Sequence, residues 1–363
     1  MKIPPAFVCL LLLIVYHAAR VEGRGTPARG SRNQWSSMFV FGDDFVDNGN
    51  RPNITGENTS RQWSYPYGSY LNSHYPTSPV LSGRFSNYRM QSDFIARMLG
   101  LHEAPPAYAL TSDQSCDSSG MTFASGGAGV FKVTAKRKVP TLAAQVQAFK
   151  RLVNDGVIPT RQLHHSVALI AISGNDYMSG SDANNGFYSS FDDLDTYVGN
   201  VATEILDNVA QLQKLGVRKV LVNNLHPIGC MPLHTSSSNY TTCDLLGNYG
   251  ASMHNKYLKQ MLEDRDNVHI LDLYTAFTDI VNHAPGGGSK DFKLNLTPCC
   301  ESTYDGGYCG ERSHSGKRLY ELCGNPDTMF YWDQTHPTDA GWEAVMNALQ
   351  QPLMEFFDEE YVA

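Results

Sequence analysis

Short apolar segments alternate with segments of helical periodicity along most of the chain of 363 residues. Apolar runs over 38–41 and 167–172 each end at a polar turn, which is typical of buried strands. Strands that alternate with helices predict an α/β fold with a mainly parallel sheet covered on both faces. Helices are expected over 89–99, 141–153, 193–215, 250–263 and 340–357, and further strands over 121–130, 217–222 and 268–273.

The pattern predicts a single domain over 37–357, because no internal repeat and no linker-like segment divides it. Residues 24–36 are rich in Arg, Gly and Pro, which predicts a flexible lead-in. Residues 48–82 are rich in Asn, Tyr, Pro, Ser and Gly, and we expect them to form a long surface loop.

The start of the chain has the features of a secretory signal peptide. Lys2 gives a positive flank, Ala6 to Val15 form an apolar core, and small residues lead up to Gly23. We expect residues 1–23 to be removed, and an uncleaved anchor is the alternative. Later in the chain, no stretch approaches the roughly 18 apolar residues of a spanning helix. The predicted location is extracellular or the cell wall, with the secretory-pathway lumen or the vacuole as alternatives.

Secretion also predicts N-linked glycans, because the chain carries four Asn-X-Ser/Thr sequons. A proline, Pro298, follows the last sequon and weakens it. The four acceptor positions are Asn53, Asn58, Asn239 and Asn295.

The cysteines predict disulfide-stapled loops in the last third of the chain. Cys9 leaves with the signal peptide, so seven remain and at least one has no intramolecular partner. Six of the seven lie after residue 229, where Cys230 and Cys243 can close a short loop. The pairing among the last four stays open. A zinc site is the alternative, and the absence of a Cys-X-X-Cys pair with nearby His pairs counts against it.

The charge balance limits the partners of the protein. The chain has 28 Lys and Arg against 36 Asp and Glu, a formal net charge of -8. Nucleic-acid binding needs a basic face, so a general nucleic-acid partner is not expected. The adjacent Asp43 and Asp44 have no further acidic cluster near them in sequence, so we expect no metal and no cofactor.

Polar clusters follow several of the predicted strands, at the sheet edge where α/β proteins place their sites. Asp333 and His336 are three residues apart, and a histidine oriented by a carboxylate is the base half of an acyl-transfer triad. The side chain of Asn175 and the backbone N–H of Gly126 are candidate oxyanion donors. Ordinary turn and capping roles are the alternative for each residue taken alone.

Six ordered blocks resemble the plant GDSL esterase/lipase family of the SGNH hydrolases. The first block, FGDDFVDNGN, is similar to the family's FGDSLVDNGN. The resemblance extends from Met38 to about Pro352. The other five blocks are Gly83–Asn87, Phe123–Gly129, Gly174–Asp176, Asn224–Pro232 and Asp333–Pro337.

The resemblance implies a three-layer α/β/α, flavodoxin-like fold and ester hydrolysis or acyl transfer through a serine acyl-enzyme. It assigns His336 as general base, Asp333 as its orienting partner, and Gly126 and Asn175 as oxyanion donors. The implied partner is a lipid or small-molecule ester, with an acceptor alcohol in the case of transfer.

Asp44 departs from this pattern, since it stands where the family has its nucleophilic serine. An ionised carboxylate needs no base, but its attack on an ester yields a high-energy anhydride. It also puts negative charge where the oxyanion forms. His336 would lie between two carboxylates, which favours imidazolium and weakens it as a base.

Four hypotheses follow from this departure. Asp44 or His336 activates water or an alcohol directly. Asp44 is itself a nucleophile. Ser125 has taken over that role. Finally, the protein binds an ester, acyl lipid or acylated sugar without turnover. We favour ester chemistry, because the other expected site residues remain. Trp63, Tyr65 and Tyr67 are candidates to line a substrate groove or to pack over the sheet, and His226 is expected in a surface or loop role.

Overall fold

The computed structural model describes residues 35–52, 58–69, 83–111, 115–132, 139–178, 191–282, 292 and 294–359. All of them belong to one unit that begins at Trp35. The predicted signal peptide, residues 24–34 of the lead-in, and the sequon at Asn53 lie outside the described residues.

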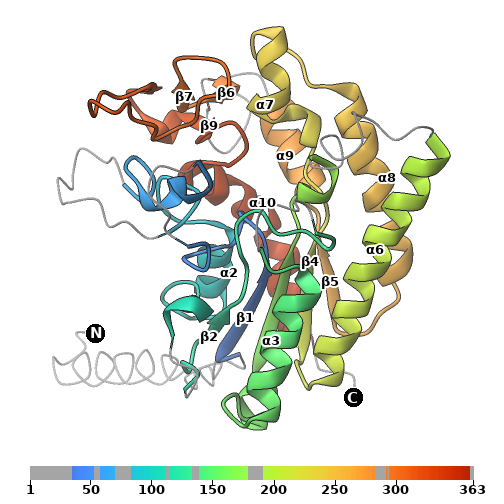
Figure 1. Ribbon diagram of the computed structural model, residues 1–363. Coiled ribbons are helices and arrows are strands. Elements are labelled where there is room, and N and C mark those ends of the chain that lie inside the picture. Colours follow the sequence, from blue (N-terminus) through green and yellow to red (C-terminus); the bar gives the residue numbers. More distant parts are fainter. Residues whose placement is uncertain are drawn as a thin grey trace, which may run out of the picture. The chain divides into compact units, whose positions relative to one another are not determined.

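A five-stranded parallel sheet lies at the centre of this unit (Figure 1). The strands β1 to β4 are fully buried, which accounts for their largely apolar sequences, and the edge strand β5 is partly buried. The β2 strand is shorter than predicted because the glycine-rich residues after Thr122 leave the sheet as a turn. The order is β2 (Gly120–Thr122), β1 (Ser37–Gly42), β3 (Ser166–Ala171), β4 (Lys219–Asn223) and β5 (Val268–Leu271).

Helices cover both faces of the sheet, because successive strand residues point to opposite sides. Met38 and Val40 of β1 join one apolar cluster, and Phe39 and Phe41 join the other. The predicted three-layer α/β/α architecture is therefore confirmed. The first cluster contains α2 (Gln91–Met98), α9 (Leu273–Asn282) and α10 (Asp339–Asp358). The second contains α3 (Leu142–Asn154), α6 (Phe191–Lys214) and the end of α8 (Leu245–Leu262).

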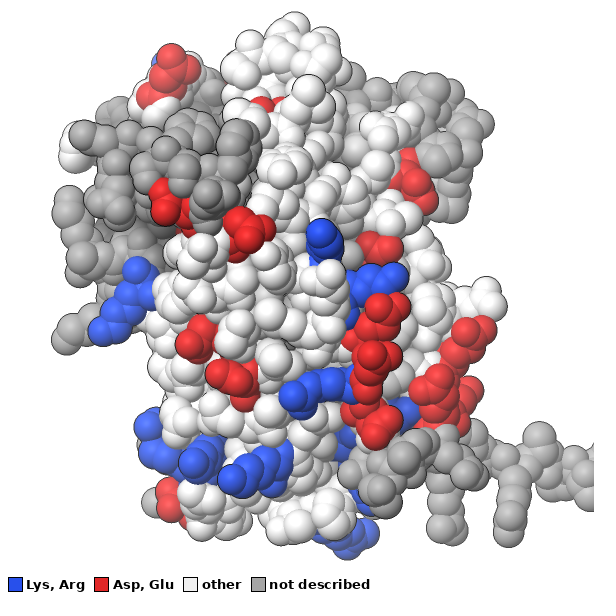
Figure 2. Space-filling model, turned by 90° about the vertical axis from the view of Figure 1, so that its right-hand side faces the viewer, with Lys and Arg blue, Asp and Glu red and all other residues white. Residues whose placement is uncertain are grey.

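The predicted helices are all present, and their ends differ from the predictions by a few residues. The largest difference is at α8, which begins five residues before the predicted start at 250. Asp244 caps it by accepting hydrogen bonds from the backbone N–H groups of Leu246 and Gly247. On the side of the molecule that carries α6 and α8, acidic and basic side chains lie interspersed (Figure 2).

Short elements complete the described chain. Two small sheets pair β6 (Leu294–Pro298) with β9 (Met329–Tyr331), and β7 (Cys300–Ser302) with β8 (Tyr320–Leu322). Two short α-helices are α4 (Thr160–Leu163) and α7 (Pro232–Thr235). The 3-10 turns are η1 (Asn58–Trp63), η2 (Tyr108–Leu110), η3 (Ile228–Cys230), η4 (Ser236–Ser238) and η5 (Pro326–Thr328).

Disulfides staple the last third of the chain, as predicted. The three bonds are Cys230–Cys243, Cys299–Cys323 and Cys300–Cys309. Cys116 is free and half-buried. Among the described residues, no helix combines the length and apolar character that crossing a membrane requires.

Two surface predictions are wrong. The described part of 48–82 contains η1 and buries the side chains of Arg51, Ser60 and Tyr67, so it is not a surface loop throughout. His226 lies in a loop, which is one of its two expected places, but it is not at the surface, because it is 1% exposed and its ring centre is 5.0 Å from that of Phe45. Both errors have one cause, because polar composition does not reveal which polar groups find partners inside the fold.

Candidate active site

A glycine turn ends β1 and places the acidic pair that follows it. Gly42 has φ +135°, and a Cβ built on it would lie 1.9 Å from the carbonyl oxygen of Ala171. Gln145 of α3 fixes the same turn, because its side-chain amide exchanges two hydrogen bonds of 2.8 Å with the backbone of Gly42. Both contacts require this backbone path, so the positions of Asp43 and Asp44 are set by β3 and α3.

Asp43 ties the ends of β1 and β3 together. Its buried carboxylate accepts hydrogen bonds from the backbone N–H of Ser173 at 2.6 Å and from the Ser173 hydroxyl at 2.8 Å. Burial and the neighbouring charge of Asp44 raise the pKa of Asp43 to about 8. The residue acts as a local anchor.

Asp47 takes the N–H group that the sequence assigned to the oxyanion. Its buried carboxylate accepts from the backbone N–H of Gly126 at 2.7 Å and from three N–H groups that follow Asp47 in sequence. In this arrangement the Gly126 N–H donates to Asp47 and not into the cavity, and an oxyanion role for Gly126 stays a prediction. Gly126 is required for a different reason, since a Cβ there would lie 2.6 Å from the ring of Phe85.

Asp44 instead meets the next glycine. Its Oδ1 atom accepts hydrogen bonds from the backbone N–H of Gly127 and from Nδ2 of Asn175, the latter at 3.3 Å. Its Oδ2 atom lies 3.5 Å from Nε2 of His336. The side chain is 18% exposed. The structure thus brings Asp44, Asn175 and His336 together.

The pair Asp333 and His336 forms at a tight turn just before α10. Asp333 Oδ1 accepts from both the backbone N–H of His336, at 2.9 Å, and its Nδ1, at 2.8 Å. The three-residue spacing makes this double contact possible within one turn. Thr338 then caps α10 by accepting from the N–H of Gly341. Nδ1 is held by Asp333, so Nε2 is left to face Asp44.

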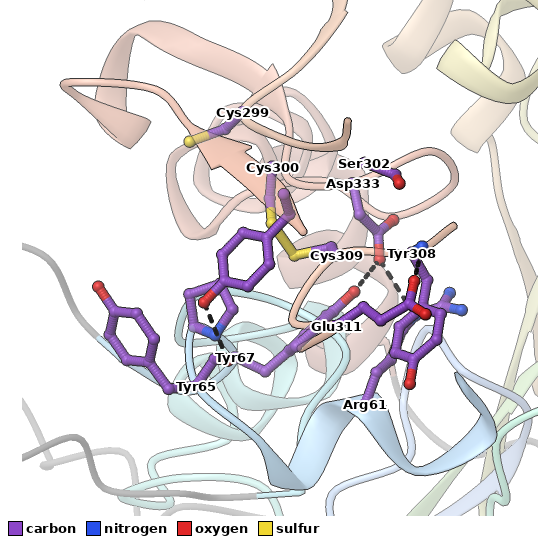
Figure 3. The surroundings of a disulfide bond; sticks show 12 residues. Arg61, Tyr65, Tyr67, Cys299, Cys300, Ser302, Tyr308, Cys309, Glu311 and Asp333 are labelled. Atoms are coloured by element: carbon purple, nitrogen blue, oxygen red, sulfur yellow. Dashed lines mark hydrogen bonds and ion pairs between the residues drawn. A yellow bond between two sulfur atoms is a disulfide. The ribbon is translucent and has the colours of Figure 1, made fainter. Parts of the chain in front are cut away.

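Two site residues were not found by the sequence reasoning in these roles. Tyr67 donates its hydroxyl to Asp333 Oδ2 at 2.6 Å, and Nε of Arg61 lies 3.5 Å from the same oxygen (Figure 3). Tyr67, which the sequence offers as a candidate to line a substrate groove, also lines a cavity at this site. Trp63 donates its indole N–H to the Arg51 carbonyl instead, at 2.7 Å. Arg61 has no signal in the sequence that distinguishes it from other arginines.

Charges alternate along this buried row. Burial alone lowers the pKa of His336, but Asp333 and then Asp44 outweigh it and raise that pKa to about 9. Burial raises the pKa of Asp44, yet His336 and the Gly127 N–H bring it down to about 2. The pKa of Asp333 is also lowered, because His336 and Arg61 outweigh its burial. At neutral pH, His336 is therefore an imidazolium and not a base.

A cavity of about 280 Å³ lies over these residues. Ser125 is 2% exposed and is not part of its lining. Within the described part of the chain, no group of three or more His, Cys, Asp or Glu side chains is placed to hold a metal ion. The lining includes the polar floor of Asp44, Gly127, Asn175 and Asp333, the apolar Phe85, Met178 and Leu233, and the disulfide Cys300–Cys309. Figure 3 shows this disulfide together with Asp333.

Comparison with known proteins places this geometry in a family. One GDSL esterase/lipase of Arabidopsis thaliana is 32% identical over 327 residues, which cover 88% of this chain and 87% of the relative. Another GDSL esterase/lipase of Arabidopsis thaliana is 32% identical over 369 residues, which cover 96% of this chain and 97% of the relative. A catalytic mutant of an acetylxylan esterase from Geobacillus stearothermophilus has a TM-score of 0.38 at 13% identity, covering 90% of this chain and 96% of that one. The pattern of the GDSL-like lipase/acylhydrolase family matches residues 38–349, and the chain belongs to that family.

Proposed function

We propose that the protein is a secreted ester hydrolase or acyltransferase that works without a serine acyl-enzyme. The family and the esterase/lipase names of its relatives support an acyl ester as substrate. Asp44 stands at the position that the family resemblance gives to the serine nucleophile. The observation that carries the proposal is the row Asp333, His336 and Asp44, joined at 2.8 and 3.5 Å, of which Asp333 and Asp44 line the cavity.

In the proposed reaction, the oxygen of a water molecule, or of an acceptor alcohol, attacks the ester carbonyl, and Asp44 accepts the proton that this water or alcohol loses. His336 donates the Nε2 proton, first as a hydrogen bond to the carbonyl oxygen and then fully to the leaving alkoxide. The ester C–O bond breaks, and the proton on Asp44 returns to His336 across 3.5 Å. Because its pKa is about 2, Asp44 is a weak base, and we expect turnover to be slow.

Binding without turnover is the second candidate, and one observation favours it. The Gly127 N–H and Asn175 Nδ2 already contact Asp44 Oδ1, so neither donor is open to a substrate carbonyl. In this case the cavity would bind an ester, an acyl lipid or an acylated carbohydrate.

An assay of the mature protein with short p-nitrophenyl esters, alone and with acceptor alcohols, separates the two candidates. The enzyme proposal expects slow turnover that is lost in both Asp44→Asn and His336→Ala. Turnover that survives His336→Ala contradicts it. Turnover that appears only in Asp44→Ser supports the binding candidate. Labelling by a fluorophosphonate that is lost in Ser125→Ala would instead point to Ser125.

Secretion and glycosylation are part of the proposal. Asn239 is exposed at a turn with φ 55°, which suits a glycan acceptor. Asn295 is a poor glycan acceptor, because its Nδ2, the atom to which a glycan would be attached, donates to the carbonyls of Ile280 and Val281 at 3.2 and 3.3 Å. We therefore expect Asn295 to carry no glycan. Peptide mapping of the secreted protein is expected to find a glycan at Asn239 and none at Asn295.

A further inference from the structure

The two oxygens of Asp44 have different surroundings. Oδ1 is held by the N–H groups of Gly127 and Asn175, whereas Oδ2 is 3.5 Å from Nε2 of His336. The carboxylate also lines the cavity. A carboxylate that is fixed by one oxygen presents the other in a defined direction, which is what a nucleophile requires.

The product of attack depends on the carbon that is attacked. Attack on an acyl carbon gives an anhydride, but attack on a saturated carbon gives an ordinary carboxylic ester. The carbonyl oxygen of that ester is Oδ1, already in contact with Gly127 and Asn175. These donors would then stabilise the oxyanion that forms when water attacks the ester of Asp44 itself. The geometry that hinders acyl chemistry therefore suits alkyl chemistry.

We propose that Asp44 opens epoxides by attack on a saturated ring carbon, and that the resulting aspartyl ester is hydrolysed to a diol. An epoxide is the substrate class because ring strain drives its opening by a carboxylate. The leaving oxygen departs on the side opposite Asp44 Oδ2, and rotation about the C–C bond of the opened ring then brings this alkoxide to His336 Nε2, which lies 3.5 Å from Oδ2. The apolar Phe85, Met178 and Leu233 supply a lining for the alkyl part of such a substrate. This activity goes beyond ester cleavage and uses the same cavity.

The steps balance as a net addition of water. Asp44 Oδ2 forms a bond to the ring carbon, the C–O bond of the ring breaks, and His336 protonates the leaving oxygen. Neutral His336 then takes a proton from water as its oxygen attacks Cγ of Asp44. The oxyanion on Oδ1 collapses, the alcohol oxygen leaves with the proton from His336, and the new carboxylic acid returns a proton to His336. One oxygen of Asp44 now comes from water.

Oxygen exchange into Asp44 tests this directly. The mature protein is turned over with a short terminal epoxyalkane in water enriched in oxygen-18, and its peptides are then mapped by mass spectrometry. We expect diol formation and oxygen-18 in the peptide that contains Asp44. Diol formation with the label only in the diol would overturn the proposal, as would the absence of diol. Asp44→Asn is expected to form no diol.

A second probe traps the covalent intermediate. A primary alkyl bromide loses bromide without needing a proton, so it does not require His336 as an acid. With this probe, His336→Gln is expected to accumulate an alkyl ester on Asp44, at close to one per protein, because the base for the second step is missing. An adduct elsewhere, or no adduct on Asp44, would count against a nucleophilic Asp44.

The outcome is separable from that of the ester proposal. Asp44→Ser is expected to cleave p-nitrophenyl esters and to lose the epoxide reaction. A wild-type protein that is inactive on esters but exchanges oxygen into Asp44 supports this inference alone. Circular dichroism and thermal unfolding of each variant establish that a lost activity is not lost folding.

Discussion

At the scale of single residues, one carboxylate changes the chemical character of the whole site. Asp333 contacts Nδ1 of His336, and Asp44 adds a second carboxylate on the Nε2 side of the same ring. With Arg61 beside Asp333, negative and positive charges alternate along the buried row. Each ion is stabilised by its neighbours, so a histidine that would serve a serine as a base becomes a proton donor.

We therefore expect Asp44→Ser to lower the pKa of His336 below its value of about 9. Removing the carboxylate removes one of the two interactions that keep the imidazolium charged. Esterase activity should appear in this variant and rise with pH as His336 becomes neutral. Nitrogen NMR of the labelled imidazole measures the pKa, and Asp44→Asn is the isosteric control. An unchanged His336 titration would show that Asp44 does not govern it.

At the scale of elements, the sequence predicted the scaffold and most of the site for a physical reason. Apolar periodicity reports burial, so each predicted strand and helix has a counterpart in the fold, although β2 is much shorter than predicted and α9 was not predicted. Polar residues at the carboxyl ends of strands must gather at one edge, which brought Asp44 and Asn175 together. The choice between Gly126 and Gly127 depends on backbone angles and on competition from Asp47, and neither is visible in the sequence. Tyr67 and Asp333 are 266 residues apart in sequence, so only the folded chain shows that they form a hydrogen bond.

The turn that carries Asp44 depends on α3, so Gln145→Ala is expected to destabilise the fold by about 1–3 kcal/mol. The reason is that the buried N–H of Gly42 loses its partner, whereas the Gly42 carbonyl keeps the hydrogen bond from the Ser125 N–H at 3.0 Å. Gln147→Ala on the same helix is the matched control, because Gln147 is exposed, and we expect it to cost under about 0.5 kcal/mol. Urea unfolding measures both. Equal effects would show that the Gly42 contacts contribute little.

The disulfide Cys300–Cys309 is expected to shape the cavity as well as stabilise the chain. Loss of either Cys300–Cys309 or Cys230–Cys243 should lower the free energy of unfolding by about 3 kcal/mol. The two losses should be similar because the two disulfides close loops of similar length. Only Cys300–Cys309 lines the cavity. In the Asp44→Ser background, the double Cys→Ser change at 300 and 309 should raise KM for esters, while the change at 230 and 243 should not. A KM that responds equally to both would assign the effect to general loosening.

At the scale of the whole molecule, the buried ionisable groups link the stability of the fold to pH. His336 and Asp43 hold their protons more tightly in the folded state, with pKa values of about 9 and about 8. His226 and His254 are neutral when folded, because burial lowers the pKa of each to about 3. Above about pH 7.5, both of these histidines are neutral in the folded and the unfolded chain alike, so they add no slope there.

The free energy of unfolding is therefore expected to fall between about pH 7.5 and pH 9. In this range unfolded His336 has largely lost its proton and folded His336 keeps it, so the folded state binds more protons and raising the pH destabilises it. The His336 contribution is fully present below pH 6.5 and is lost as the pH passes through about 9, with a size on the order of 3 kcal/mol. Urea unfolding at several pH values measures it. His336→Gln should keep only the shallower decline from Asp43, which ends near pH 8. If wild type and variant decline in parallel up to pH 9, His336 is not held as an imidazolium in the folded protein.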